Sequence, residues 1–119
     1  MDRKKICEVC LVPKHLRTSC EFCKAWQVTN GRWKLYIIWL LRDGIKRFSD
    51  FEKLMVDISP KVLTEQLREL EADGIVSRTV YEESPIRVEY ELTPLGKEFL
   101  QISEKMAEIG KQIPFPDDK

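Results

Sequence analysis

The stretch from Ser59 to Gly74, SPKVLTEQLRELEADG, constrains the fold of this chain more than any other. Ser59 and Pro60 suit the N-cap and the first position of a helix, and Gly74 can take the positive φ that ends one. Three leucines at i, i+4 and i+7 make one apolar stripe, Leu63, Leu67 and Leu70. The opposite face carries Lys61, Thr64, Glu65 and Arg68. The pattern predicts an amphipathic helix over 59–73 with a cationic, hydroxyl-bearing face.

A second helix is predicted directly before this one. Ser49-Asp50-Phe51-Glu52 has the pattern of a capping box, with Ser49 as N-cap and Glu52 reaching back to it. Its inward-facing residues are expected to be Phe51, Leu54 and Met55. Val56-Asp57-Ile58 then forms a three-residue turn. Residues 49–73 therefore predict helix, short turn, helix, the geometry that places a second helix in the major groove of DNA.

The segments on either side complete a small domain. Upstream, Trp33–Arg42 (WKLYIIWLLR) predicts a buried central helix that Asp43-Gly44 ends, and Arg47-Phe48 predicts a short extended segment. Downstream, the apolar period changes to two in 75–81 and 87–92, which predicts a β-hairpin with its loop at 82–86. A helix-turn-helix followed by a hairpin is the winged arrangement; the alternative is a hairpin that only closes the core.

Thr93-Pro94 repeats the N-cap and proline pattern and opens a last helix. Its apolar residues step by four and three, at Leu95, Phe99, Ile102, Met106, Ile109 and Ile113. A heptad seam of this length exceeds what a small domain needs for its own core. It predicts a dimerisation helix over 94–111 that pairs with a second copy of the chain.

Composition indicates one globular domain and leaves the partner open. The 119 residues are 34% charged and 43% hydrophobic with zero net charge, and 59–92 holds four basic residues against eight acidic ones. A nucleic-acid binder of this kind must rely on local basic positions. No apolar run has transmembrane length, and the basic N-terminus lacks the apolar region of a secretory signal. We expect a cytoplasmic protein that does not contact membranes.

All four cysteines lie near the N-terminus in the spacing C-x2-C-x9-C-x2-C. Two CxxC pairs can direct four thiolates at one tetrahedral ion, so Cys7, Cys10, Cys20 and Cys23 predict a structural zinc site, one ion per chain. A redox-reactive pair of Cys20 and Cys23, an iron–sulfur centre or unligated thiols are the alternatives.

The predicted organisation is α+β and mostly helical. A cysteine segment occupies 1–24, a winged helix-turn-helix domain with its dimerisation helix occupies 25–111, and a tail occupies 112–119. An enzyme is the least expected class of protein. The chain has one histidine, no Ser/His/Asp set and no phosphate-binding glycine loop.

From Cys20 to about Lys111, the sequence resembles the HxlR family of winged helix-turn-helix transcriptional regulators. The resemblance rests on motifs in order and at matching spacings, Gly31-Arg32-Trp33-Lys34, Arg47-Phe48-Ser49-Asp50-Phe51, Ile58-Ser59-Pro60-Lys61-Val62-Leu63-Thr64, Leu67-Arg68-Glu69-Leu70-Glu71-Ala72-Asp73-Gly74-Ile75-Val76 and Pro85-Ile86-Arg87-Val88-Glu89-Tyr90-Glu91-Leu92-Thr93.

This resemblance implies a homodimer that binds operator DNA as a repressor or activator. It also implies a sensor cysteine thirteen positions before Trp33, which is Cys20; several family members use it to sense quinones, aldehydes or oxidants. Two features depart from the family. Glu21 stands where relatives usually have proline, and Cys7, Cys10 and Cys23 are additions that can make Cys20 a metal ligand. A metal-bound thiolate can still be oxidised, with metal release as the signal.

The sequence therefore predicts a dimeric, sequence-specific regulator of transcription that binds double-stranded DNA at a palindromic operator. The residues expected to contact DNA are Ser59, Lys61, Thr64, Arg68, Arg87 and Arg47, with Lys46 as a further phosphate contact. Pairing of Arg68 with Glu65 or Glu71, and of Arg87 within the hairpin, are the intramolecular alternatives. The acids Glu69, Glu71 and Asp73 are expected to point away from DNA. The alternative function is a winged-helix module for protein–protein interaction with a structural zinc site.

Overall fold

A computed structural model of the chain describes residues 21–114. The chain divides into two compact units, one ending at Arg32 and the other beginning at Trp33. The first contributes helix α2 (Glu21–Thr29), on which Cys23 is buried and the exposed rings of Phe22 and Trp26 stack at 6.3 Å. None of the helices in the described range has the length and apolar content needed to cross a membrane.

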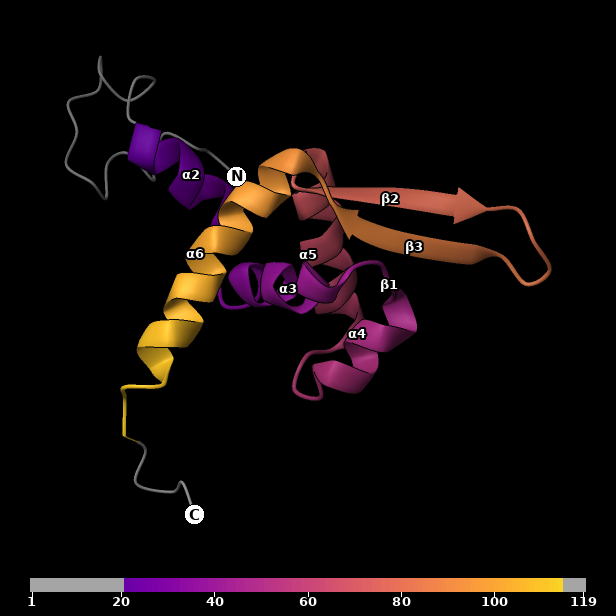
Figure 1. The fold of residues 1–119 in the computed structure, drawn as a ribbon. Coiled ribbons are helices and arrows are strands. Elements are labelled where there is room, and N and C mark those ends of the chain that lie inside the picture. Colours follow the sequence, from indigo (N-terminus) through magenta and orange to yellow (C-terminus); the bar gives the residue numbers. More distant parts are fainter. Residues whose placement is uncertain (1–20, 115–119) are drawn as a thin grey trace. The chain divides into compact units, whose positions relative to one another are not determined.

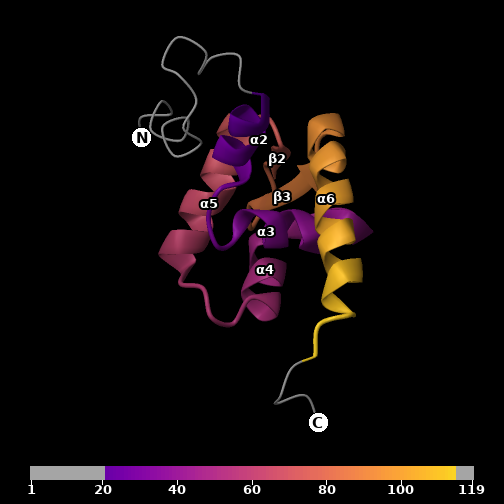
Figure 2. The same ribbon diagram turned by 90° about the vertical axis from the view of Figure 1, so that its left-hand side faces the viewer.

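The second unit is a winged helix-turn-helix, as the sequence predicts. In chain order its elements are α3 (Lys34–Leu40), the 3-10 turn η2 (Leu41–Asp43), β1 (Lys46–Arg47), α4 (Phe48–Leu54), α5 (Pro60–Ala72), β2 (Val76–Tyr81), β3 (Arg87–Leu92) and α6 (Pro94–Gly110). Strands β2 and β3 extend away from the helices as a hairpin (Figure 1). Helices α5 and α6 stand on either side of α3 and α4 (Figure 2).

The core of this unit is built on α3, the helix predicted to be buried. Ile37 and Ile38 are fully buried, and Gly44, with φ of +119°, turns the chain out of η2. The helix is not buried all round, because Tyr36 is 42% exposed. The three leucines of α5 and Ile75 complete this core, each at most 1% exposed. Burying an apolar side chain of this size contributes about 1.5–3 kcal/mol, so the leucine stripe fixes which face of α5 is left for solvent.

The sheet has three antiparallel strands in the order β1-β3-β2. The predicted hairpin is confirmed, with Tyr81 opposite Arg87 and Val76 opposite Leu92. Tyr90 on the central strand pairs with Arg78 on one side and Lys46 on the other, so these three residues share one face of the sheet. The extended segment predicted at Arg47-Phe48 is strand β1, which begins one residue earlier and ends at Arg47.

The capping box predicted at Ser49 and Glu52 is wrong. Helix α4 begins at Phe48, and Arg47 at its N-cap donates its main-chain N–H to the Asp50 carboxylate at 2.8 Å. The cap is displaced by two residues because β1 pairs with β3 and holds Arg47 extended, so the helix starts where this pairing ends. The inward orientation predicted for Leu54 is also wrong. Leu54 is 49% exposed, whereas Phe51 and Met55 are buried.

Helix α6 packs against α3 on one face and leaves an apolar stripe on another. Phe99 is buried, and the buried Ser103 donates its hydroxyl to the Leu35 carbonyl at 2.9 Å. The remaining residues of the predicted seam are each between 46% and 54% exposed. Leu95, Ile102, Met106 and Ile109 form the stripe on α6, and Ile113 follows the end of the helix at Gly110. At about 100° per residue, this stripe lies roughly a quarter of a turn from the face that holds Gly96 and Ser103.

Candidate nucleic-acid interface

Helix α5 presents to solvent the face that the sequence predicts. Lys61, Thr64, Glu65 and Arg68 are all exposed, and the buried leucines hold the opposite side. The alternative in which Arg68 pairs with a glutamate of its own helix is not found: across residues 21–114, Arg68 makes no ion pair with either Glu65 or Glu71. Its guanidinium is therefore available to a ligand.

The two hydroxyl groups of this helix are held by main-chain groups. Ser59 is the N-cap, as predicted, and its Oγ accepts a hydrogen bond from the Val62 N–H at 3.2 Å. Thr64 donates its hydroxyl proton to the Pro60 carbonyl at 2.8 Å. Thr64 thus offers solvent its methyl group and the lone pairs of its oxygen, which suit a thymine methyl or a base amino group.

The hairpin carries two arginines, and their environments differ. Arg87 contacts the carboxylates of Glu83 at 2.9 Å and Glu89 at 2.8 Å, and its guanidinium lies 4.0 Å from the centroid of the Tyr81 ring. The intramolecular alternative for Arg87 is confirmed. Its positive charge is balanced within the hairpin, and the DNA contact at Arg87 stays a prediction. Arg78, by contrast, is exposed and makes no ion pair in the described part of the chain.

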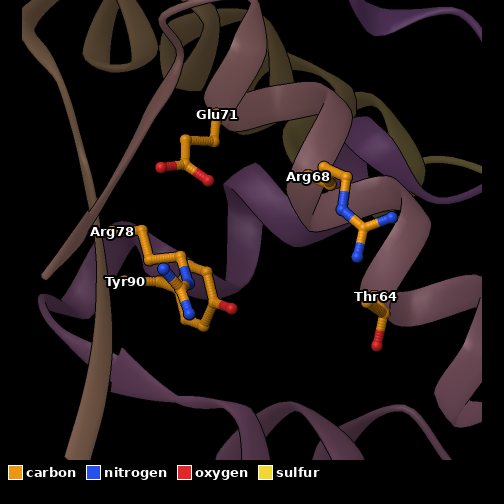
Figure 3. A pocket seen from close by; sticks show the side chains of 5 residues that line it. All are labelled: Thr64, Arg68, Glu71, Arg78 and Tyr90. Atoms are coloured by element: carbon orange, nitrogen blue, oxygen red, sulfur yellow. The ribbon is translucent and has the colours of Figure 1, made fainter. Parts of the chain in front are cut away.

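Arg78 lies on a cleft between α5 and the hairpin. This cleft has a volume of about 340 Å³ and is lined by Thr64, Arg68, Glu71, Arg78 and Tyr90. Figure 3 shows the five side chains around one open space, with Arg68 and Arg78 on opposite sides of it. Two of the residues predicted to contact DNA, Thr64 and Arg68, are therefore brought together with an arginine of the hairpin.

Sequence reasoning missed Arg78, although a signal for it was present. A loop at 82–86 sets Tyr81 opposite Arg87, and counting back along the two strands sets Arg78 opposite Tyr90. Arg78 is a single cation in the β-branched run of β2. Strand register would have placed it beside Tyr90 on the central strand, and the tertiary structure places both next to α5.

The acidic residues of α5 have two different environments. Glu69 pairs with the ammonium group of Lys34 at 2.6 Å, and the Lys34 side chain is only 7% exposed. Glu71 lines the cleft together with Arg68 and Arg78, and the expectation that it points away from DNA stays a prediction. Because Glu71 follows Arg68 by three positions, both side chains lie on one side of the helix.

The other residues predicted to contact DNA lie just before α4 and in the first turn of α5. Lys46 and Arg47 form β1, and Arg47 is also the N-cap residue of α4. The Arg47 side chain is exposed, and Lys46 is partly exposed. Lys61 is exposed in the first turn of α5. These positions are compatible with phosphate contacts, which need an accessible cation.

Three of the four cysteines, Cys7, Cys10 and Cys20, lie outside the described residues. Cys23 is buried on α2. Within residues 21–114, no three His, Cys, Asp or Glu side chains are grouped closely enough to hold a metal ion. The zinc site and the redox pair therefore stay predictions.

Comparison with known proteins gives one family. The model of the HxlR-like helix-turn-helix family matches residues 28–117. The uncharacterized HTH-type transcriptional regulator YybR of Bacillus subtilis is 45% identical over 95 residues, which cover 80% of this chain and 76% of that protein.

Solved structures agree with this comparison. The redox regulator HypR in its oxidized form is 41% identical and has a TM-score of 0.77, with 81% of this chain and 99% of that chain covered. The reduced form of the transcriptional regulator YodB from B. subtilis is 36% identical with a TM-score of 0.67, and the match covers 83% and 98% of the two chains.

Proposed function

Because the chain belongs to the HxlR-like helix-turn-helix family of transcriptional regulators, we propose that it binds a palindromic operator as a homodimer and thereby controls transcription. The observation that carries the proposal is the exposed face of α5, which holds Lys61, Thr64 and Arg68, the last two at the cleft beside the hairpin. A helix with this face can lie in the major groove, where Arg68 can donate two hydrogen bonds to guanine or to a phosphate. Ser59 and Arg47 would contact phosphates at the edges of the groove.

The exposed stripe of α6 supports the homodimer. Four large apolar side chains in heptad spacing on α6 are about half exposed in the single chain, with Ile113 just beyond the helix, although the same helix already buries Phe99 against its own domain. Exposing such a stripe to water costs about 25 cal/mol for each Å² of apolar surface. A second copy can cover it with the same stripe, because a two-fold interface is self-complementary. Two copies of α5 would then read half-sites about 34–36 Å apart, one helical turn of DNA.

Nuclease footprinting tests this function on DNA upstream of the gene and its neighbours. We expect one protected region containing an inverted repeat, and a mobility shift that weakens steeply as salt is raised. Weak retention of DNA that does not depend on salt, with no protected repeat, would contradict the proposal. That result would favour the interaction module, to which the acidic excess of 59–92 is suited.

Control by the cysteines is the second part of the proposal. The spacing of Cys7, Cys10, Cys20 and Cys23 suits one zinc ion, and zinc-bound thiolates can be oxidised with release of the metal. The similar protein HypR, described as a redox regulator with a reduced and an oxidized form, supports thiol control of this kind. Cys20 and Cys23 are the pair that we expect to react if no metal is bound.

Two measurements separate these forms of control. Elemental analysis of protein purified without added metal is expected to give one zinc per chain, with thiols that react only after chelation. No zinc and four freely titrating thiols would favour the redox pair instead. Operator binding measured with and without a chelator and a mild oxidant then tests whether either state changes the affinity for DNA.

A further inference from the structure

The cleft between α5 and the hairpin has an excess of positive charge. Arg68 and Arg78 line it from two elements, and Glu71 is the one carboxylate among its five lining residues. Neither arginine has an ion-pair partner in the described range. Two unpaired guanidinium groups around one open space are expected to repel one another, and an anion placed between them would relieve this repulsion.

The wall of the cleft is held firmly by the sheet and the core. Tyr90 is only 8% exposed, and its ring meets the Phe51 ring edge-on at 6.1 Å. Its hydroxyl oxygen points into the open space in Figure 3. Arg78 lies directly opposite Tyr90 in the strand pairing, and Lys46 lies opposite it on the other side. A row of two cations flanking a phenol hydroxyl thus runs across the sheet beside the recognition helix.

We propose that this cleft binds one phosphate of the DNA backbone, with Arg78 of β2 and Arg68 of α5 on either side of it and the Tyr90 hydroxyl as a further donor. This inference rests on the proposed function, and it assigns the phosphate contact of the hairpin to Arg78. Arginine suits the role because its fork of N–H groups matches two phosphate oxygens. The cleft lies next to the exposed face of α5, where the backbone would pass if that helix lies in the groove.

Glu71 opposes the phosphate and therefore limits the strength of binding. One carboxylate against two guanidinium groups leaves a net charge of one positive unit in the cleft. The variant Glu71→Gln removes the repulsion and is expected to tighten binding several-fold on any DNA sequence, since phosphate contacts carry no sequence information.

The test compares purified full-length variants by fluorescence anisotropy on an operator and on a scrambled duplex, over a range of salt concentrations. Arg78→Gln is expected to weaken binding about ten-fold or more on both duplexes. It should also reduce the slope of log K against log salt by about 0.9 per subunit. Tyr90→Phe removes a neutral donor, so we expect a smaller loss of affinity with no change in slope.

Two control variants separate the cleft from general charge and folding effects. Arg42→Gln removes the same charge from an arginine that lies 3.9 Å from the Trp39 ring centroid, outside the cleft, and should change affinity little. Arg78→Lys keeps the charge and should retain the salt slope while losing part of the affinity. Because Arg78 is exposed and unpaired, the melting temperature of Arg78→Gln should match that of the parent protein.

Neutral methylphosphonate groups, placed one at a time along each half-site, identify the phosphate. One position should weaken the parent protein clearly more than it weakens Arg78→Gln, which keeps the Arg68 and Tyr90 contacts. The Arg68→Gln and Arg78→Gln effects should be less than additive if both hold that phosphate. An unchanged slope for Arg78→Gln, or a loss confined to one base sequence, would overturn the assignment while leaving the proposed function intact. Failure of the parent protein to prefer any operator would overturn both.

Discussion

Thr93 joins the end of α5, the hairpin and α6 through its hydroxyl. It donates to the carbonyl of Gly74 at 2.6 Å or of Ile75 at 3.0 Å, and it accepts from the Gly96 N–H at 3.0 Å. The Thr93 N–H adds a bond to the Ile75 carbonyl at 3.0 Å. One residue therefore caps α6 and fixes it to the end of α5.

Gly96 is required by this close approach. A Cβ atom at Gly96 would collide with the main-chain carbonyl oxygen of Ile75, whereas a Cβ at Gly110 would meet nothing within 4 Å. We expect Gly96→Ala to lower the free energy of unfolding by about 1–3 kcal/mol, because a backbone atom cannot move aside easily. Gly110→Ala, in the same helix, should be neutral or stabilising by up to about 1 kcal/mol. Urea unfolding of both variants checks this, and equal effects would contradict it.

The Lys34 ammonium group is buried and depends on Glu69 for its partner. We expect Glu69→Gln to destabilise the fold by about 1–3 kcal/mol, since it weakens the ion pair of a lysine whose side chain is 7% exposed. Lys34→Met replaces the buried charge with an apolar chain of similar length, so its cost should be smaller. A double-variant cycle in urea measures the coupling. Additive effects would show that the ion pair does not hold α5 to α3.

At the scale of elements, α5 combines stability and binding in its first turn. Ser59 caps the helix and is also expected to contact DNA. Ser59→Ala should lower stability by about 1 kcal/mol because the Val62 N–H loses its acceptor. Ser59→Asp retains a cap acceptor but places a carboxylate near the phosphates.

The two substitutions at Ser59 therefore separate the two roles. We expect Ser59→Asp to melt close to the parent temperature and to bind operator DNA at least several-fold more weakly. Thermal unfolding and anisotropy on the same samples provide the measurement. Unchanged DNA affinity in Ser59→Asp would remove this residue from the interface.

The hairpin has a charge pattern that limits what it can do as a wing. Arg87 is enclosed by Glu83, Glu89 and the Tyr81 ring, so the loop end of the hairpin is internally neutralised. Ile86 in the loop is 68% exposed. The cation that the hairpin can offer to DNA is Arg78, near the helices and away from the loop.

At the scale of the whole molecule, the stripe on α6 should decide the oligomeric state. Ile102→Asp places a charge in the centre of five half-exposed apolar residues. We expect this variant to sediment as a monomer, and to bind a palindromic operator at least ten-fold more weakly because each half-site is then bound separately. Analytical ultracentrifugation gives the mass.

Glu104→Lys is the matched control for this variant, because Glu104 is exposed and lies on the side of α6 away from the stripe. It should leave the dimer and its DNA affinity unchanged. A dimeric Ile102→Asp protein would show that α6 does not form the interface.

The local features of the fold could be read from the sequence because their causes are local. The Ser59 and Thr93 caps, the leucine stripe and the Gly74 turn, with φ of +77°, depend on spacings within one helix turn. The hairpin followed from a change of period and a proline-containing loop. The free stripe of α6 was also visible, since a heptad longer than the domain needs has no partner inside it.

Other features depended on residues far apart in the chain. Arg47 became the cap of α4, instead of Ser49, because β1 pairs with a strand more than 40 positions later, which determines where the helix starts. Leu54 ends α4 with half of its side chain exposed, whereas Met55 directly after it is buried.

The sequence by itself predicted the winged helix-turn-helix, and it determined the face of α5 that meets solvent, because the burial of regularly spaced leucines fixes the opposite side of that helix. Only the tertiary structure decided which hairpin arginine is available to a ligand. Glu83 and Glu89 neutralise Arg87, while the strand register sets Arg78 opposite Tyr90 and beside Arg68. Charge is a property of a residue, but whether that charge is available depends on the neighbours that folding brings to it.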